Sequence, residues 1–343
     1  MPTLYVDTQG AMIIKRDNEV LVVKDGQTLE RVPIEKLDQL VIMGRGVQLT
    51  TAMIIELMER GIPASICNER GSRLYGHIVP PGASRLAGLR SQQMVAVHTP
   101  AIALELARAM VAAKLTNQRG LLTATGWEAA PTAVGQIDVS LAGLSTAATI
   151  DIVRGYEGSG AAAYFGAWRA ALPASWAFGG RNYYPPPDPI NALLSFGYTL
   201  ALNDVRLAVE LTGLDPYLGT FHVIEAGRPS LALDLLEEFR PLLVDRMVLE
   251  LAQGGQIGRE AFERPAERAD AVYLTQAGRQ RFIERYEALL NSAATLPDGQ
   301  RTTWRRVLLL QAQALARVFR GEQERYSGFT GGDAARRGRP RGV

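Results

Sequence analysis

Apolar and polar positions alternate over short runs through the N-terminal part of the chain, which is typical of β-strands with one buried face. Four of these runs are rich in β-branched residues: LYVD at 4–7, AMIIKRD at 11–17, EVLVVKD at 19–25 and TLERVPI at 28–34. Asp17-Asn18 and Asp25-Gly26 stand between runs and predict tight hairpin turns. The pattern therefore predicts a β-rich N-terminal domain over residues 1–82.

Two segments of this domain break the alternation. QLVIMG at 39–44 is continuously apolar and predicts a strand covered on both faces. AMIIELMER has helical spacing, with Thr51 expected as its N-cap and Gly61 as its end. Two further strands are expected in PASICN at 63–68 and LYGHIVP at 74–80.

The spacing of the apolar residues changes after the sequence PPG at 80–82, and residues 83–326 carry them three and four positions apart, as helices do. Glycine and proline interrupt this pattern at 173–190 and predict a long functional loop. The Gly/Arg-rich residues 327–343 have little to bury and predict a disordered basic tail. The expected fold class is α+β, with a small N-terminal β-rich domain and a larger all-α C-terminal domain.

Length and composition are those of an ordinary globular protein. The 343 residues suffice for two domains, and the hydrophobic fraction is 47%. Cys67 is the one cysteine, which excludes an intramolecular disulfide and fits a reducing compartment. The sequence shows no export signal, and no apolar run reaches the roughly eighteen residues that span a bilayer. We therefore expect a cytoplasmic protein.

The charge is nearly balanced, at +2, and does not by itself indicate a nucleic-acid partner. Only four of the 37 cationic residues are lysines, and the others are arginines. The planar guanidinium group suits phosphate recognition. A GC-rich genome would favour arginine codons equally well, so composition leaves both explanations open.

Histidine is rare, and its three positions differ in context. His77 lies in a strand pattern and His98 near a helix end, where structural or surface roles are expected. His222 follows a turn-rich segment and precedes a helical pattern that carries Asp234 and Glu237 on one face. Two carboxylates and an imidazole would suit Mg²⁺ or Mn²⁺. The alternative is a solvated acidic helix face, and Glu238 is the expected example of it.

Glu157 is a second unusual carboxylate. It lies in an apolar helical pattern and is flanked by Gly155, Gly158 and Gly160. Small neighbours allow another backbone or a ligand to approach closely, and a buried glutamate requires a partner that a metal ion would supply. An exposed glutamate at a helix boundary is the alternative.

Several long motifs resemble the CRISPR-associated integrase (Cas1) family of spacer acquisition. They are EGSGAAAYF at 157–165, RNYYPPPDPINALLSFGYTL at 181–200, GLDPYLGTFHVIEAGRPSLALDLLEEFRPLLVDR at 213–246 and AVYLTQAGRQRFIERYE at 271–287. Their order and spacing also match, and the resemblance extends to about residue 326. It implies the two-domain architecture of that family, with catalysis in the helical domain.

The resemblance also implies a metal-dependent site. Its Mg²⁺ or Mn²⁺ ligands would be Glu157, His222 and Glu237. Glu237 is preferred to Glu238 because it stands three residues before Arg240 in the family's acid-x-Phe-Arg-Pro stretch. Asp234 would support the ligands, and Asn191 would either support them as well or pack the helices.

The activity implied is insertion of new spacer DNA at the repeat boundary of a CRISPR array, by attack of a DNA 3′-hydroxyl on a phosphodiester. Water in place of that hydroxyl would make the same site an endonuclease. The implied partners are DNA fragments and the repeat array, a second copy of the chain, and the small Cas2 protein in a heterohexamer. The N-terminal domain would be the dimerisation surface.

DNA would need further contacts, for which the sequence offers cations near the motifs and two tyrosines. The cations are Arg85, Arg90, Lys114, Arg119, Arg181, Arg240 and Arg246. Arg240 could instead neutralise Asp234 or Glu237. Tyr184 and its neighbour Tyr183 could stack on an unpaired base or pack beneath the adjacent prolines. Alternatives for the whole protein are a stand-alone structure-selective nuclease, a transposon-type integrase, and a non-catalytic DNA-binding scaffold.

Overall fold

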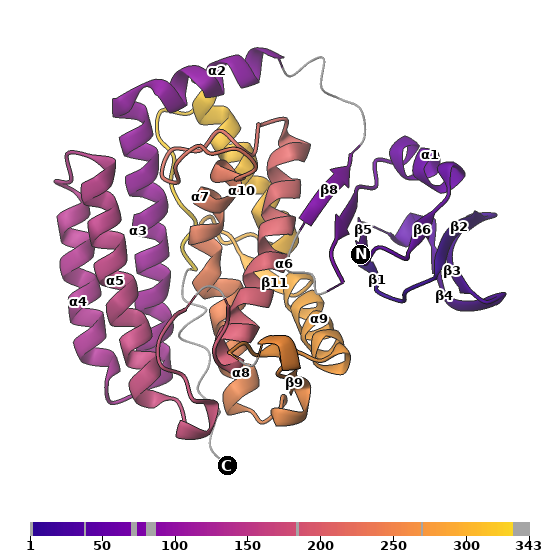
Figure 1. Ribbon diagram of the computed structural model, residues 1–343. Coiled ribbons are helices and arrows are strands. Elements are labelled where there is room, and N and C mark those ends of the chain that lie inside the picture. Colours follow the sequence, from indigo (N-terminus) through magenta and orange to yellow (C-terminus); the bar gives the residue numbers. More distant parts are fainter. Residues whose placement is uncertain are drawn as a thin grey trace. The chain divides into compact units, whose positions relative to one another are not determined.

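The computed structural model describes residues 3–37, 39–69, 74–79, 87–182, 185–268 and 270–331. It divides into two compact units, Met1–Leu86 and Ala87–Val343 (Figure 1). The expected domain boundary after residue 82 lies in 80–86, outside the described residues. Each unit is described by itself below.

The N-terminal unit contains two four-stranded sheets. One has the order β1 (Thr3–Val6), β5 (Gln39–Met43), β7 (Ala64–Cys67), β8 (Leu74–Ile78), and the other has the order β4 (Gln27–Pro33), β3 (Glu19–Lys24), β2 (Met12–Arg16), β6 (Gln48–Leu49). β5 pairs in parallel with β1 and β7, and all five of its residues are buried, as its continuous apolar run predicts.

The predicted turns of this unit are confirmed. Asp17 and Asp25 have φ values of 53° and 51°, the left-handed conformation that two-residue hairpins require. The helix α1 (Thr51–Glu59) also forms, but its cap is Thr50, whose Oγ1 accepts a hydrogen bond from the N–H of Met53. The prediction of Thr51 as N-cap is therefore wrong by one residue.

The C-terminal unit is mainly helical. Its α-helices are α2 (Ala87–His98), α3 (Pro100–Thr125), α4 (Ala130–Leu144), α5 (Ile150–Ala171), α6 (Pro189–Thr212), α7 (Ser230–Phe239), α8 (Arg246–Gln253), α9 (Gln276–Leu290) and α10 (Trp304–Phe319). In Figure 1, α3, α4 and α5 lie side by side, and α7 packs against both α3 and α6. This packing brings α3, α5 and α7 together around the candidate site.

Two features of this unit differ from the prediction of an all-α domain. Two small two-stranded sheets are present, β9 (Phe262–Glu263) with β10 (Tyr273–Leu274) and β11 (Ala293–Thr295) with β12 (Arg301–Thr303). Strands of two or three residues are too short to show an alternating pattern, so the sequence does not reveal them. The mixed class, with sheets in the N-terminal part and helices after it, is confirmed.

The predicted tail begins later than expected. Residues 327–331 pack in the helical unit, where Phe329 is buried and stacks on Phe239 with ring centroids 5.9 Å apart. Burial of this aromatic side chain helps to anchor a segment whose composition otherwise indicates disorder. Residues 332–343 lie outside the described residues.

The loop predicted at 173–190 is confirmed for the described residues 173–182 and 185–188, and α6 begins at Pro189. The loop contains one short 3₁₀ turn, η3 (Ala174–Trp176), before Asp188 caps the N-terminus of α6. Within the described ranges, no single helix is both long and apolar enough to cross a membrane, and only α2 and α3 together, bent by 90°, meet that length and composition.

Candidate active site

Glu237 lies on α7 just before the helix changes its hydrogen-bond pattern. Pro241 has no N–H to donate to the carbonyl of Glu237 four residues earlier, and the chain forms a π-helical segment, η4 (Arg240–Asp245). Such segments often occur at functional sites. Nη2 of Arg240 lies 3.2 Å from Oε1 of Glu237.

Lys114 of α3 joins Glu237 to Glu157 of α5. Its Nζ lies 2.5 Å from Oε1 of Glu157 and 2.5 Å from Oε2 of Glu237. Oε2 of Glu237 is buried and has no hydrogen bond of good geometry, so its contact with Lys114 is best described as an ion pair. Three helices thus bring two carboxylates to one ammonium group.

Burial and charge act in opposite directions on this cluster. Burial disfavours the ionised form of Glu237, but Arg240, Lys114 and His222 together outweigh it and lower its pKa from 4.5 to about 2. Burial disfavours the charged form of Lys114, but Glu237 and Glu157 outweigh it and raise its pKa above 10.5. Glu237 and Lys114 are therefore both charged at neutral pH.

His222 is held beside Glu237 by Asp234. Nδ1 of His222 lies 2.7 Å from Oδ1 of the fully buried Asp234, and Nε2 lies 3.8 Å from Oε1 of Glu237. Nδ1 is therefore engaged by Asp234, and Nε2 is the ring nitrogen that faces Glu237. This is how proteins orient a histidine that binds a metal.

Asp234 also fixes the loop that carries His222. Its carboxylate accepts hydrogen bonds from the backbone N–H groups of Thr220, Phe221 and His222 at 2.6, 2.9 and 2.8 Å. Gly219 allows this approach, because a Cβ there would stand 2.5 Å from the backbone of Ser230. The supporting position implied for Asp234 agrees with these contacts.

The donor chemistry of Glu157, His222 and Glu237 fits a divalent metal ion. Carboxylate oxygens suit Mg²⁺ and Mn²⁺, and an unprotonated imidazole nitrogen adds a preference for Mn²⁺. Lys114 marks the place between the carboxylates where positive charge is required. In the part of the chain that the structure describes, no three His, Cys, Asp or Glu side chains are grouped closely enough to enclose an ion as they now stand. A metal on both glutamates therefore requires Lys114 to move.

The prediction that Glu238 lies on a solvated face is wrong. Its side chain is fully buried and accepts hydrogen bonds from the hydroxyl of Tyr326 at 2.6 Å and the N–H of Phe329 at 2.7 Å. Gln311 donates to it as well, at 3.2 Å. Glu238 therefore holds the segment after α10, while Glu237 faces the candidate site.

Glu238 predicts a measurable pH dependence of stability. Burial, opposed by its hydrogen bonds, raises its pKa from 4.5 to about 7. The folded state then binds the proton more tightly, so this stabilisation is complete below pH 4.5 and is lost as the pH rises through about 7. Glu238→Gln, which stays neutral, should gain up to about 3 kcal/mol relative to wild type between pH 5 and pH 8 in chemical unfolding. A difference that does not change with pH would contradict this.

Asn191 supports Arg181 and not the proposed ligands. Its Oδ1 accepts hydrogen bonds from Arg181 Nη1 and the N–H of Asn182, both at 2.9 Å. Its Nδ2 donates to Gly180 and Asp188 at 2.8 and 2.7 Å. Asn191 therefore fixes the end of the long loop and positions the Arg181 guanidinium.

Removing this support tests the expectation that Arg181 contacts DNA. Asn191→Ala frees Arg181 and is expected to lower the affinity for short DNA about fivefold, close to 1 kcal/mol, in fluorescence anisotropy. Asn291→Ala, at an exposed position on the C-terminal side of α9, is the matched control and should bind as wild type does. Equal affinities for both variants would show that the support of Arg181 by Asn191 does not contribute to DNA binding.

A cavity of about 450 Å³ adjoins the cluster and is rich in cations. Its lining includes Lys114, Glu157, Arg169, Arg181, Tyr198, Arg240 and Asp245. The ring of Tyr198 lies under both guanidinium groups, at 5.3 Å from Arg181 and 4.6 Å from Arg240. The Tyr198 hydroxyl donates to Asp245 at 2.5 Å. Tyr198 therefore fixes two arginines beside the carboxylates.

The sequence did not reveal Tyr198 and Asp245 as members of the site. Burial raises the pKa of Asp245 from 3.8 to about 6, opposed by hydrogen bonds from Tyr198 and Tyr164. A charged residue inside the apolar run PLLVD was the available signal, because a buried aspartate needs such donors.

The other candidate cations lie elsewhere. Arg119 pairs with Asp138, and Arg246 pairs with Glu250, and both arginines line a different cavity of about 640 Å³. Arg90 donates to the carbonyl of Gly213. Arg85, Tyr183 and Tyr184 lie outside the described residues.

The other two histidines do not belong to the cluster around Lys114. The ring of His77 forms a hydrogen bond with Ser65 in the N-terminal unit, and His98 is exposed.

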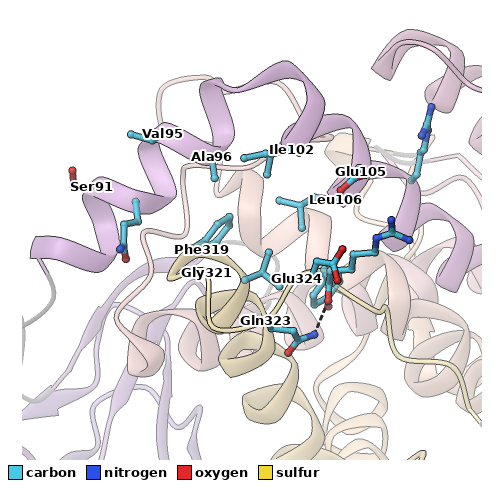
Figure 2. Close-up of a pocket in the computed structure, with 15 residues that line it drawn as sticks. Ser91, Val95, Ala96, Ile102, Glu105, Leu106, Phe319, Gly321, Gln323 and Glu324 are labelled. Carbon is cyan, nitrogen blue, oxygen red and sulfur yellow. Dashed lines mark hydrogen bonds between the residues drawn. The ribbon is translucent and has the colours of Figure 1, made fainter.

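Figure 2 shows a further cavity, of about 600 Å³, between α2, α3 and the segment after α10. Val95, Ile102 and Phe319 contribute apolar side chains, and Glu105 and Glu324 contribute acidic ones. The described residues that line it include no histidine and none of the three proposed ligands. The cluster around Lys114 therefore remains the candidate for catalysis.

The family model described as CRISPR associated protein Cas1 matches residues 4–288 of the sequence. This chain belongs to the Cas1 family. A Cas1 relative from Thermus thermophilus, named CRISPR-associated endonuclease Cas1 3, is 33% identical over 328 residues, which cover 91% of this chain and 95% of the relative.

Two solved structures share the Cas1 fold. A casposase bound to integration product has a TM-score of 0.84 and 23% identity, covering 95% of this chain and 93% of that chain. A Cas6-RT-Cas1–Cas2 complex has a TM-score of 0.80 and 22% identity, covering 96% of this chain and 36% of that chain. At these identities the likeness concerns the fold.

Proposed function

We propose that this protein is a metal-dependent DNA integrase and endonuclease of CRISPR adaptation, which inserts spacer DNA by attack of a 3′-hydroxyl on a phosphodiester. The observation that carries the proposal is the buried cluster in which Glu237 contacts His222 and shares Lys114 with Glu157. Membership of the Cas1 family supports it, since relatives are named CRISPR-associated endonucleases.

In this proposal, Glu157, Glu237 and Nε2 of His222 hold Mg²⁺ or Mn²⁺. When bound, the ion would supply the positive charge that activates the attacking hydroxyl and stabilises charge at the phosphate. Asp234 would accept a hydrogen bond from Nδ1–H and so leave Nε2 as the ligand nitrogen. The same residues would cut DNA when water takes the place of the hydroxyl.

The arginines bind and orient the DNA. Arg181 and Arg240 face the cavity next to Glu157 and are held on the ring of Tyr198, so little of their freedom is lost when they bind a phosphate. Their positions direct a phosphodiester toward the carboxylates. Arg240 has a second role, because its guanidinium also pairs with Glu237.

The proposed partners follow from the similar proteins. The casposase structure contains an integration product, and another similar structure contains Cas2. These two structures support DNA as substrate and Cas2 as a partner. We further propose a homodimer formed through the N-terminal unit and a heterohexamer with Cas2. Light scattering of the protein alone and with Cas2 would measure both assemblies.

The test is an integration assay with labelled DNA fragments and a supercoiled plasmid that carries a CRISPR array. Joining is expected with Mn²⁺ or Mg²⁺ and should fall below detection in chelator, because Glu157 and Glu237 then hold no metal ion. Joining that persists in chelator would overturn the proposal.

The similarity to a casposase favours a second candidate, a transposon-type integrase that acts without Cas2. Joining that needs neither Cas2 nor an array would support this candidate or a stand-alone nuclease. A non-catalytic scaffold would bind DNA and join none under any of these conditions.

A further inference from the structure

The ammonium of Lys114 lies where the two carboxylates of the site converge. Its side chain is 8% exposed, and Nζ is 2.5 Å from both Glu157 and Glu237. We propose that Lys114 is an exchangeable counter-ion, which neutralises these carboxylates in the metal-free protein and moves to a DNA phosphate when a divalent metal binds. This inference rests on the proposed metal-dependent function.

The charges of the cluster explain the exchange. Glu157 and Glu237 carry two negative charges, and Lys114 and Arg240 balance them with two positive ones. A divalent ion on the same carboxylates would leave an excess of two positive charges within a few ångströms. Repulsion at this distance in a buried site is large, so Lys114 is driven away from the carboxylates.

The adjoining cavity provides space into which the ammonium group of Lys114 can move. Lys114 lines this cavity of about 450 Å³ in its present conformation, together with Arg181 and Arg240. A lysine side chain has a flexible four-carbon stem, so its ammonium can move by several ångströms while α3 stays in place. The excess positive charge left by the metal would be neutralised there by a phosphate.

Among Lys114, Arg181 and Arg240, Lys114 is the cation that metal binding would release. Arg181 and Arg240 are both held on the ring of Tyr198, and Tyr198 is anchored through its hydroxyl to Asp245. Lys114 is held by the two carboxylates, which are the groups that the metal would take from it. Metal binding therefore releases the lysine and leaves the arginines in position.

A purely structural ion pair would behave differently. Loss of one partner would then destabilise the protein equally with and without metal, because an uncompensated charge stays buried. Under the exchange proposed here, the metal replaces the missing ammonium. Metal binding and metal-dependent stability therefore distinguish the two roles without an activity measurement.

The first experiment titrates Mn²⁺ into the full-length, DNA-free protein by isothermal calorimetry. Lys114→Met removes the competing charge and keeps the length of the side chain, so it should bind Mn²⁺ at least about tenfold more tightly than wild type. It should unfold at a lower temperature than wild type in chelator and recover with Mn²⁺. Lys36→Met, at an exposed lysine of the N-terminal unit, should match wild type in both.

Lys114→Arg is a second variant, which keeps the test decisive if Lys114→Met fails to fold. It keeps a cation between the carboxylates and should bind Mn²⁺ no more tightly than wild type. Mn²⁺ binding by wild type without tighter binding by Lys114→Met would overturn the exchange and leave the proposed function standing. Absence of Mn²⁺ binding in both, with joining in chelator, would overturn the proposed function and the exchange together.

The second experiment tests the phosphate contact through the salt dependence of DNA binding. With Ca²⁺ present, the slope of log Kd against log salt should be smaller by about one for Lys114→Met than for wild type. In chelator the slopes should agree, because Lys114 then stays with the glutamates. Equal slopes under both conditions would overturn the phosphate step.

Discussion

His222→Ala is expected to reduce strand joining about 1,000-fold, equivalent to ~4 kcal/mol in the barrier, with the fold preserved. His222 supplies the nitrogen that faces Glu237 at 3.8 Å, and its side chain is only 16% exposed, so some packing is lost with it and stability must be measured beside activity. The measurement is the initial rate of joining at saturating Mn²⁺, with thermal unfolding recorded on the same samples.

His98→Ala is the matched control for this substitution. His98 is exposed at the end of α2, and its ring contacts the carbonyl of Met94 in its own helix. It should join DNA at the wild-type rate. His222→Ala with full activity would remove the imidazole from the proposed site, whereas loss of DNA binding along with joining would indicate a defect in folding.

The N-terminal strands were predictable because local signals decide them. The Asp17-Asn18 and Asp25-Gly26 turns set the hairpin ends, and the continuous apolar run at 39–44 identified the buried central strand. β6 and β9 to β12 were missed, since a pairing of two or three residues depends on tertiary context. Phe329 shows the same limit, because its burial requires Phe239 from a distant helix.

The proposed ligands of the candidate site could be named from the sequence, but their arrangement in space could not be predicted from it. The rarity of histidine singled out His222. Local context made Glu157 and Glu237 candidates that the family resemblance then selected, while the sequence placed Lys114 only among general DNA contacts. Its position between the glutamates depends on the packing of α3 against α5 and α7, which no local pattern encodes. The burial of Glu238 was missed for a related reason: its partners Tyr326 and Phe329 are 88 and 91 residues away.

Asp234→Asn is expected to reduce joining about 100-fold by reversing the tautomer of His222. Oδ2 of Asp234 accepts from two loop N–H groups, so the asparagine oxygen is drawn to that side and the amide nitrogen faces Nδ1 of His222. Nδ1 must then accept, Nε2 carries the proton, and no lone pair faces Glu237. Nitrogen-15 chemical shifts of the His222 ring would report the change directly.

Two substitutions separate this effect from loss of stability. Asp234→Ala leaves the N–H groups of Thr220, Phe221 and His222 without their acceptor, and should cost about 3 kcal/mol in unfolding free energy. Asp270→Ala, whose carboxylate is exposed and pairs with Arg268 two residues earlier, should change neither stability nor joining. Because Asp234→Asn keeps two of the loop hydrogen bonds, it should lose less stability than the alanine variant and still lose joining. Wild-type joining by Asp234→Asn would mean that the orientation of His222 is set by something other than this carboxylate.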